Sequence, residues 1–357
     1  MKKGILLGCL FLFATCAFSQ SFMVGMNTII ADKNGVCIGF DPANQLVIRS
    51  SFGQPPAIDY LNKDSLAIEG ALNNGAVAWG ALGAFGIGVG PDGSIVAMDH
   101  IENPEPMLSL IRWTSYTDVN PMMCVPANSV PFPRGICVIG TGSEQTIFCS
   151  GANVNDPINV FTTADGSNFM FNYSVGSKAA SQFGGQRGVA AYIGNGTPNY
   201  PQFIFGCDTD FGGDVGIHYF ERLAGVYTYK GKLNTKAIDS LAGERIISLG
   251  VDPGIASTSE ATGEAPVLIA LGNHIGTSTP SALYMFELNN FSEVAVHAFD
   301  MAGNDVQNYG SIALDTENNR VYFTVRDGAN HTLGYADYTV PPTPKKPTAA
   351  SIWAMYE

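Results

Sequence analysis

The chain has 357 residues, of which 14% are charged and 41 are glycine, and its formal net charge at pH 7 is −13. An acidic surface repels phosphate groups, so this charge argues against nucleic acid and anionic lipid surfaces as partners. Many glycines combined with few charges favour an all-β chain with many tight turns.

The chain opens with the three parts of a secretory signal. A basic segment over residues 1–3 precedes an apolar run over 5–13, and the small-x-small site Ala17-Phe18-Ser19 follows. The apolar run is shorter than the about 18 residues that a membrane-spanning helix needs, so a signal peptide is predicted over residues 1–19. The expected location is periplasmic, cell-surface or extracellular. Lipid anchoring is an alternative, although no cysteine stands in a good context for it.

Six short β-hairpins recur along the rest of the chain. Each combines a strand, a turn rich in Gly, Asn, Asp or Pro, and a second strand. The hairpins are expected over residues 36–49, 86–99, 135–149, 188–207, 246–270 and 310–326. A single hairpin buries too little surface to be stable in water, so such units must pack side by side. Their spacing of about 50 to 63 residues is typical of β-propeller blades.

Further β-rich segments between the hairpins would complete four-stranded blades. Third strands are expected at 108–114, 158–162, 217–221, 282–288 and 332–338, and fourth strands at 169–175, 225–229 and 293–299. Residues 22–30, or residues 351–356 beyond the proline-rich spacer 341–344, would complete the last blade and close the ring. The prediction is a single all-β domain over residues 20–357, a β-propeller of six four-stranded blades. Seven blades or a β-sandwich are the alternatives.

Five cysteines lie outside the predicted signal peptide, and an odd number cannot all pair within one chain. They are Cys37, Cys124, Cys137, Cys149 and Cys207. Cys137 and Cys149 lie on the two arms of one hairpin, so a disulfide between them is one interpretation. Buried free thiols on strands are the favoured one.

Two hairpins resemble those of a known family. Ala313-Leu314-Asp315 with the strand 320–323, and Phe40-Asp41 with the strand 46–48, follow a pattern of a strand ending in Asp, a Gly/Asn turn and a VYV-like strand. This pattern resembles six-bladed propellers of the NHL and SMP-30/gluconolactonase type. For the lactonase relatives, the resemblance implies a divalent cation held by Glu, Asn and Asp of inner strands. Asp41, Asp252 and Asp315 end first strands at the hairpin turns, so the resemblance assigns no cation ligand to them.

The propeller order sorts the connections onto two faces. The hairpin turns lie on one, the turn face, and the links from second to third strands lie on the other, the loop face, where polar residues gather. The predicted ligand-binding residues are Asp99, His100, Asn155, Asp156, Asn273, His274, Asp327 and His331. Loops at one end of a rigid scaffold are a common place for binding groups.

One loop carries carboxylates at alternate positions. Asp208, Asp210 and Asp214 lie in a glycine-rich stretch, and such a loop can wrap calcium, which takes six to eight oxygen ligands. No Glu stands at the spacing of an EF-hand, and a solvated acidic turn is the alternative. Calcium is the one cofactor that the sequence suggests.

No GxSxG, HExxH or phosphate-binding GxxxxGK(S/T) motif occurs. The glycine-rich run 86–90 has no helix after it, so it is interpreted as a closely packed inner strand. The absence of a complete catalytic constellation favours a secreted, non-catalytic binding module for a protein or carbohydrate ligand, in the bacterial envelope or outside the cell. The alternative is a metal-dependent, lactonase-like hydrolase.

Overall fold

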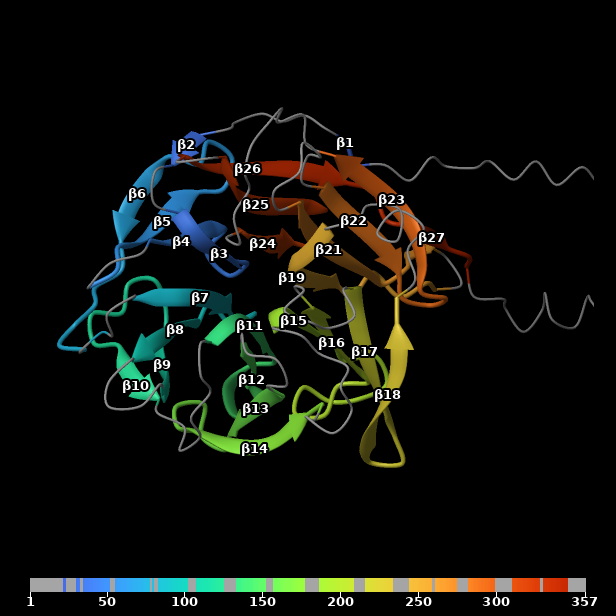
Figure 1. The fold of residues 1–357 in the computed structure, drawn as a ribbon, viewed down its shortest axis with the longest axis horizontal. Helices are drawn as coiled ribbons and strands as arrows, with labels where there is room; N and C mark the ends of the chain where they lie inside the picture. The colour runs from blue at the N-terminus through green and yellow to red at the C-terminus, as the bar shows by residue number, and fades with distance from the viewer. Residues whose placement is uncertain are drawn as a thin grey trace, which may run out of the picture.

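The fold is that of a computed structural model of the chain. The structure describes residues 22–23, 30–32, 35–51, 55–77, 79, 83–101, 107–124, 133–151, 157–176, 186–208, 216–233, 244–258, 261–274, 282–298, 310–327 and 330–345. Six antiparallel sheets surround a central axis, so the predicted six-bladed β-propeller is confirmed, and the seven-bladed ring and the sandwich are wrong (Figure 1). The predicted signal peptide lies outside the described residues. Among the described residues, no helix is long and apolar enough to cross a membrane.

Each blade runs from an innermost to an outermost strand, and the blades follow chain order (Figure 1). Blade one holds β3 (Gly35–Asp41), β4 (Leu46–Ser51), β5 (Ile58–Asn62) and β6 (Ile68–Ala71). Blade two holds β7 (Ala84–Val89), β8 (Ile95–Ile101), β9 (Met107–Trp113) and β10 (Met122–Cys124). Blade three holds β11 (Pro133–Ile139), β12 (Thr146–Gly151), β13 (Ile158–Thr163) and β14 (Phe169–Val175).

Blade four holds β15 (Gln186–Tyr192), β16 (Phe203–Asp208), β17 (Gly216–Leu223) and β18 (Val226–Lys232). Blade five holds β19 (Glu244–Asp252), β21 (Val267–His274), β22 (Ala282–Glu287) and β23 (Ser292–Ala298). Blade six holds β24 (Gly310–Asp315), β25 (Arg320–Asp327) and β26 (Asn330–Tyr338), and two short N-terminal strands complete it. All six predicted hairpins are therefore present.

The turn of the last hairpin shows why these segments fold locally. The Asp315 carboxylate accepts hydrogen bonds from the backbone N–H of Asn318 (3.2 Å) and from its Nδ2 (2.7 Å), and Asn319 takes a φ of +51°. The turn of blade one repeats the pattern, with Asn44 donating to Asp41 through its backbone N–H (3.1 Å) and Nδ2 (2.9 Å). An Asp that binds its own turn in this way sets both the reversal and the strand register.

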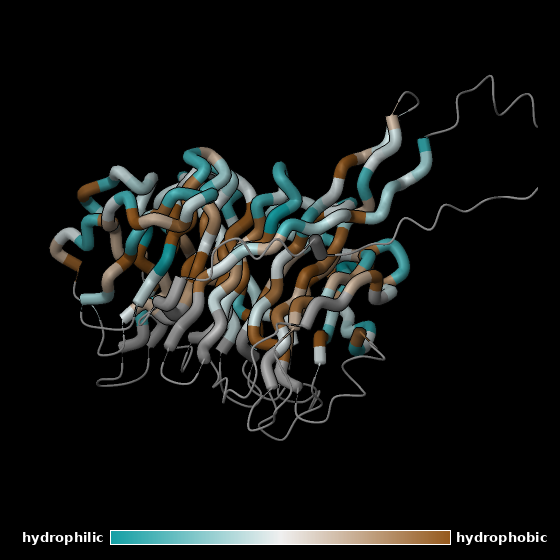
Figure 2. The backbone as a smooth tube through the Cα atoms, turned by 90° about the horizontal axis from the view of Figure 1, so that it is seen from above, coloured by the Kyte–Doolittle hydropathy of each residue, from teal (hydrophilic) through white to brown (hydrophobic). Residues whose placement is uncertain are grey.

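The hydrophobic core is divided among the spaces between neighbouring blades. Six clusters of buried apolar residues occur, each drawn chiefly from two adjacent blades. Between blades six and one, for example, the rings of Phe40 and Tyr322 stack with centroids 5.4 Å apart. Figure 2 shows hydrophobic residues running through the interior of the ring. Each blade is thus stabilised by both of its neighbours.

The glycines of the innermost strands allow these strands to approach closely. A Cβ added to Gly88 would lie 2.6 Å from Cγ2 of Val138 in the next blade, and one added to Gly39 would lie 2.6 Å from Cγ2 of Val89. Neither position has room for a side chain. The interpretation of residues 86–90 as a closely packed inner strand is confirmed.

The N-terminal segment closes the ring. β1 (Phe22–Met23) and β2 (Ile30–Asp32) both pair with β26, with Phe22 opposite Tyr338 and Ile30 opposite Leu333. Of the two segments expected to close the ring, the N-terminal one pairs with blade six, and residues 351–356 lie outside the described residues. The outer edge of blade six is therefore covered, as in other closed propellers.

The proline-rich segment near the C-terminus pairs with the long insertion in blade five. β27 (Pro342–Thr343) lies antiparallel to β20 (Gly263–Glu264). Figure 2 shows an arm that projects from the ring. Part of the predicted spacer thus forms a short strand.

The thiols of Cys137 and Cys149 are both free, so the favoured interpretation is confirmed. In the β11–β12 ladder Cys137 lies opposite Phe148, whereas Cys149 lies opposite Ile136. Successive residues of a strand point to opposite faces of its sheet. Cys149 accordingly packs between blades two and three, and Cys137 packs between blades three and four, on the other side of the sheet.

Candidate functional site

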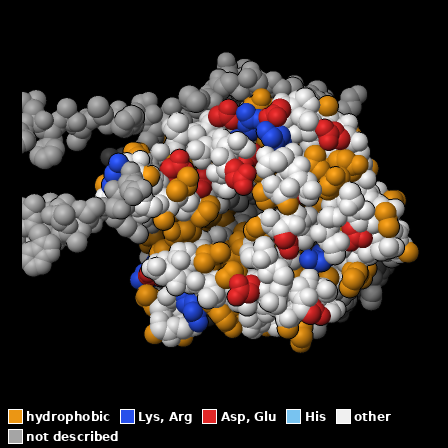
Figure 3. Space-filling model, turned by 180° about the vertical axis from the view of Figure 1, so that it is seen from behind, with side chains coloured by type: hydrophobic (Ala, Val, Ile, Leu, Met, Phe, Trp, Pro, Cys, Tyr) orange, Lys and Arg blue, Asp and Glu red, His pale blue; other side chains and the backbone are white. Residues whose placement is uncertain are grey.

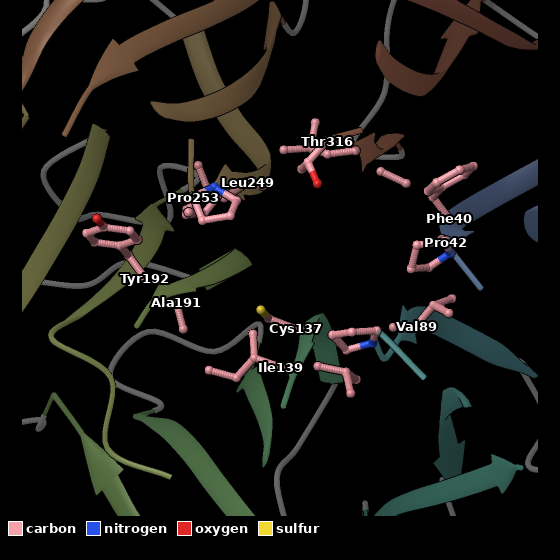
Figure 4. A pocket seen from close by; sticks show the side chains of 18 of the residues that line it. Phe40, Pro42, Val89, Cys137, Ile139, Ala191, Tyr192, Leu249, Pro253 and Thr316 are labelled. Atoms are coloured by element: carbon pink, nitrogen blue, oxygen red, sulfur yellow. The ribbon is translucent and has the colours of Figure 1, made fainter. Parts of the chain in front are cut away.

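A funnel opens at the centre of the turn face. Its walls are the six innermost strands and its mouth is formed by the hairpin turns of the blades, and it encloses about 740 Å³. The wall is mainly apolar, with Phe40, Val89, Ile139, Leu249 and Tyr192 spaced around it (Figure 4). Figure 3 shows a central hollow on this face, with hydrophobic side chains beside it. This volume suits a small molecule.

The channel narrows toward the loop face. A second, smaller space of about 50 Å³ lies there, at a level where the innermost strands carry small residues. The ring at this level consists of Cys37, Gly86, Gly135, Gly188, Ser248 and Ser311. A Cβ on Gly188 would lie 2.9 Å from the Cα of Ser248, so β15 and β19 are in close contact. We call this ring the neck of the channel.

Several innermost strands are bulged beside the neck, a feature that the sequence analysis missed. The register shifts between Gly35 and Cys37 in β3, between Ala84 and Gly86 in β7, and between Pro133 and Gly135 in β11. β15 shifts between Gln186 and Val189. Bulges are common at rims and beside active sites, where they change the direction of a side chain.

The carboxylates at the ends of first strands serve the turns. Besides the caps formed by Asp41 and Asp315, Asp252 is buried and accepts hydrogen bonds from the Gly254 N–H (2.8 Å) and the Tyr338 hydroxyl (2.8 Å). Burial raises the pKa of Asp252 above its usual value. These acids therefore have structural partners, in agreement with the sequence analysis, which assigned no cation ligand to them.

The predicted ligand-binding residues fall into three groups. Asp99 is fully buried within blade two, opposite Ser109. Asn155 and Asp156 lie outside the described residues. The other five occupy backbone positions at the loop-face ends of strands: His100 in β8, Asn273 and His274 in β21, Asp327 in β25 and His331 in β26.

The fold places one of these strand ends, that of β21, beside the start of innermost strand β19 in blade five. In blade five, His274 lies opposite Glu244 and Asn273 lies opposite Arg245. In the neighbouring blade four, Asp208 lies opposite Gln186, beside the position of Arg187. β15 packs directly against β19, so these positions share one side of the loop-face mouth.

Sequence reasoning missed Glu244, Arg187 and Arg245 as candidates. Each stands at the start of an innermost strand, one to three residues before its apolar stretch. This position in the sequence could have identified them, because the first residues of innermost strands lie nearest the axis on the loop face. Of the predicted calcium ligands, Asp208 ends β16, whereas Asp210 and Asp214 lie outside the described residues.

The described side chains do not form the cation site that the lactonase resemblance implies. No group of three His, Cys, Asp or Glu side chains able to hold a metal occurs among them. The turn carboxylates of Asp41, Asp252 and Asp315 already accept hydrogen bonds from their own loops. We therefore derive no step through a metal.

A comparison with solved structures defines the relationship of this ring to known proteins. No protein-family model and no curated protein matches the sequence. A gluconolactonase from Xanthomonas campestris, described as important in glucose secondary metabolic pathways, matches 90% of this chain over 88% of its own, with 12% identity and a TM-score of 0.53. The chain has the fold of this gluconolactonase. The resemblance seen in the hairpin sequences is thus confirmed for the architecture.

The likeness to the gluconolactonase corrects the prediction of function. The sequence analysis favoured a non-catalytic binding module because no complete catalytic motif occurs. That prediction is wrong: the matched structure is an enzyme, and the likeness covers nearly all of both chains. The lactonase-like alternative is better supported.

Proposed function

We propose that the chain is a lactonase-like hydrolase that opens a cyclic ester at the loop-face mouth of the channel. The observation that carries the proposal is the fold shared with a gluconolactonase over nearly the whole chain. A second support is the clustering of acidic, basic and imidazole residues at one side of that mouth, in blades four and five.

Hydrolysis of a lactone needs two kinds of group. A base takes a proton from water as the oxygen attacks the ester carbonyl, and a cation or hydrogen-bond donor stabilises the oxyanion that forms. The ring C–O bond then breaks, the ring oxygen is protonated, and a hydroxy acid leaves. Glu244, Asp208 and His274 are suitable bases by residue type. Arg187 and Arg245 are suitable for the oxyanion and for the carboxylate of the product.

Hydrolysis of glucono-δ-lactone and of a panel of unsubstituted lactones, followed with a pH indicator, tests this proposal. Replacing a general base costs about 100-fold or more, so we expect Glu244→Gln or His274→Asn to lower kcat by at least that factor. Glu69→Gln is the matched control, because Glu69 is an exposed acid on outermost strand β6. Full activity in both loop-face variants, or no lactone hydrolysed above background, would contradict the proposal.

The same assay tests the calcium prediction. If Asp208, Asp210 and Asp214 hold a cation that the reaction uses, EDTA abolishes turnover and calcium restores it. The melting temperature should also rise with calcium, because a ligand that binds the folded state alone stabilises it. Unchanged activity and melting temperature across millimolar calcium and EDTA would remove calcium from the proposal and leave the lactonase function to be judged by the variants.

A further inference from the structure

The funnel on the turn face is a cavity that the proposed hydrolase chemistry does not use. Its wall is formed by apolar side chains from all six blades, among them Ile139, Leu249 and Leu314. Of the groups that line it, Cys137 is a poor nucleophile, because burial raises the pKa of its thiol to about 11. The catalytic candidates of the proposed hydrolase lie on the loop-face side of the neck. A second, separate role is therefore open to the funnel.

An apolar wall of this size favours binding of a ligand that has an apolar portion. The enclosed volume of about 740 Å³ lies within the range of about 300 to 1,000 Å³ found for small-molecule pockets. Transfer of apolar surface from water into such a wall is favourable. The Tyr192 ring stands at the edge of the funnel (Figure 4) and adds an aromatic face that can also contact a cation.

The charge around the mouth is negative. Glu317 and the turn-capping Asp315 line the funnel. The surrounding hairpin turns also contain Glu144 and Asp92, of which Asp92 accepts hydrogen bonds from Ser94 of its own turn. The turn segments 41–46, 90–94, 140–146, 193–202 and 252–266 contain no Lys or Arg. The nearest cation in sequence, Arg320 after the last turn, is held by Asp337 (2.6 Å) and Asp64 (3.0 Å).

We propose that the funnel binds a small organic cation with an apolar body, of the alkyl- or arylammonium class. The apolar walls take the body, and the carboxylates of the turns attract the charged end. An anion of the same shape is disfavoured by the same carboxylates. The proposed lactone substrate is neutral and its hydroxy acid product is an anion, so neither has the charge that the funnel is proposed to attract.

Three fluorescent rods that differ chiefly in charge test the proposal: diphenylhexatriene, its trimethylammonium derivative and its propionic acid derivative. Each is titrated into the purified full chain at low ionic strength, and its fluorescence gives Kd and stoichiometry. We expect one cationic probe per chain, bound at least tenfold more tightly than the anionic one. The difference should shrink in 0.5 M NaCl, because salt screens charges at an exposed mouth. Equal Kd values for the three probes, or many probes per chain, would overturn the proposal.

Two variants test whether the cationic probe binds in the funnel. Ile139→Trp puts a large ring into the half-buried wall and should abolish binding of the cationic probe. Glu317→Lys changes an exposed residue at the mouth and should weaken the cationic probe several-fold and strengthen the anionic one. Glu69→Lys makes the same charge change on β6 and should alter neither Kd. Binding that survives Ile139→Trp, or that responds equally to Glu317→Lys and Glu69→Lys, would place the probe elsewhere.

A competition experiment separates this proposal from the lactonase function. The cationic probe should not inhibit hydrolysis of any lactone competitively, and lactone should not displace the probe. Competition between them would show a single site and overturn the assignment of the funnel as a separate one. Binding of the probe by a chain without lactonase activity would support the funnel and contradict only the proposed function.

Discussion

Asp252 shows how one residue connects local structure to the closure of the ring. It ends innermost strand β19, accepts a hydrogen bond from the Gly254 N–H of its own turn, and accepts another from the hydroxyl of Tyr338 on β26 of blade six. Burial raises the pKa of its carboxyl and raises the pKa of the Tyr338 phenol as well. The contact therefore joins two blades but places a carboxylate in an apolar environment.

The pH dependence of Asp252 follows from the direction of its pKa shift. Between the unfolded pKa of 3.8 and the higher folded pKa, the native state holds an additional proton, so the free energy of unfolding falls as pH rises through that window. Asp252→Asn keeps an acceptor for Gly254 and removes the charge. We expect the melting temperature of Asp252→Asn to rise relative to that of the parent chain between pH 4 and pH 8. A constant difference across this range would contradict the assignment.

Asp165 provides the control of opposite sign. Its exposed carboxylate accepts hydrogen bonds from the backbone N–H groups of Ser167 and Asn168, both at 2.8 Å, and from Asn168 Nδ2. These bonds lower its pKa, so its contribution is present above the unfolded pKa and is lost as the pH falls. Asp165→Asn should therefore lose stability relative to the parent at neutral pH and approach it in acid.

At the scale of the strand, spacing between the innermost strands is set by glycine. Gly88 faces Val138 of the next blade across a gap with no room for a methyl group. The two strands belong to different sheets, so this contact is between blades. The width of the ring therefore depends on single atoms in neighbouring blades, as close packing of protein interiors leads one to expect.

Gly88→Ala should destabilise the fold by about 1 to 3 kcal/mol, the usual cost of overpacking. Val138→Ala removes the atoms that the new methyl group would meet, so the double variant should be more stable than the sum of the two single effects. Urea unfolding of the four proteins measures this coupling. Strict additivity would show that the two residues do not limit the approach of β7 and β11.

The sequence predicted the strands well where local chemistry decides their limits. Both of the hairpins whose Asp binds an Asn of its own turn could be predicted, namely those with Asp315 and Asn318 and with Asp41 and Asn44. Short outer strands such as β6 and β10 were missed, because pairing with a neighbour defines them and their burial is slight. The grouping of Asp208, Glu244 and His274 was not readable either, because it arises from the packing of β15 against β19.

At the scale of the whole molecule, the ring is held closed by its N-terminal segment. β1 and β2 cover the outer edge of β26, which would otherwise expose unpaired backbone groups. The last blade therefore combines β1 and β2 from the N-terminal part of the chain with β24, β25 and β26 (Figure 1).

A chain that starts at residue 33 should be markedly less stable than one that starts at residue 20, which retains both closing strands. We expect a lower melting temperature and, in size-exclusion chromatography, association through the exposed edge of β26. The comparison uses two truncations of the same protein, so the loss of the first 19 residues is common to both. Equal melting temperatures and a single monomer peak for both would contradict closure by β1 and β2.

This closure also imposes an order on biosynthesis. Residues 22–23 leave the ribosome about 300 residues before their partners, residues 337–338. The strands of blades one to five can pair locally as they emerge, whereas blade six is complete only after β26 has been made. Pairings between segments that are distant in sequence form slowly in folding. Until then, the nascent protein is an open arc with two unpaired strand edges, and chaperones that shield strand edges can bind it during that time.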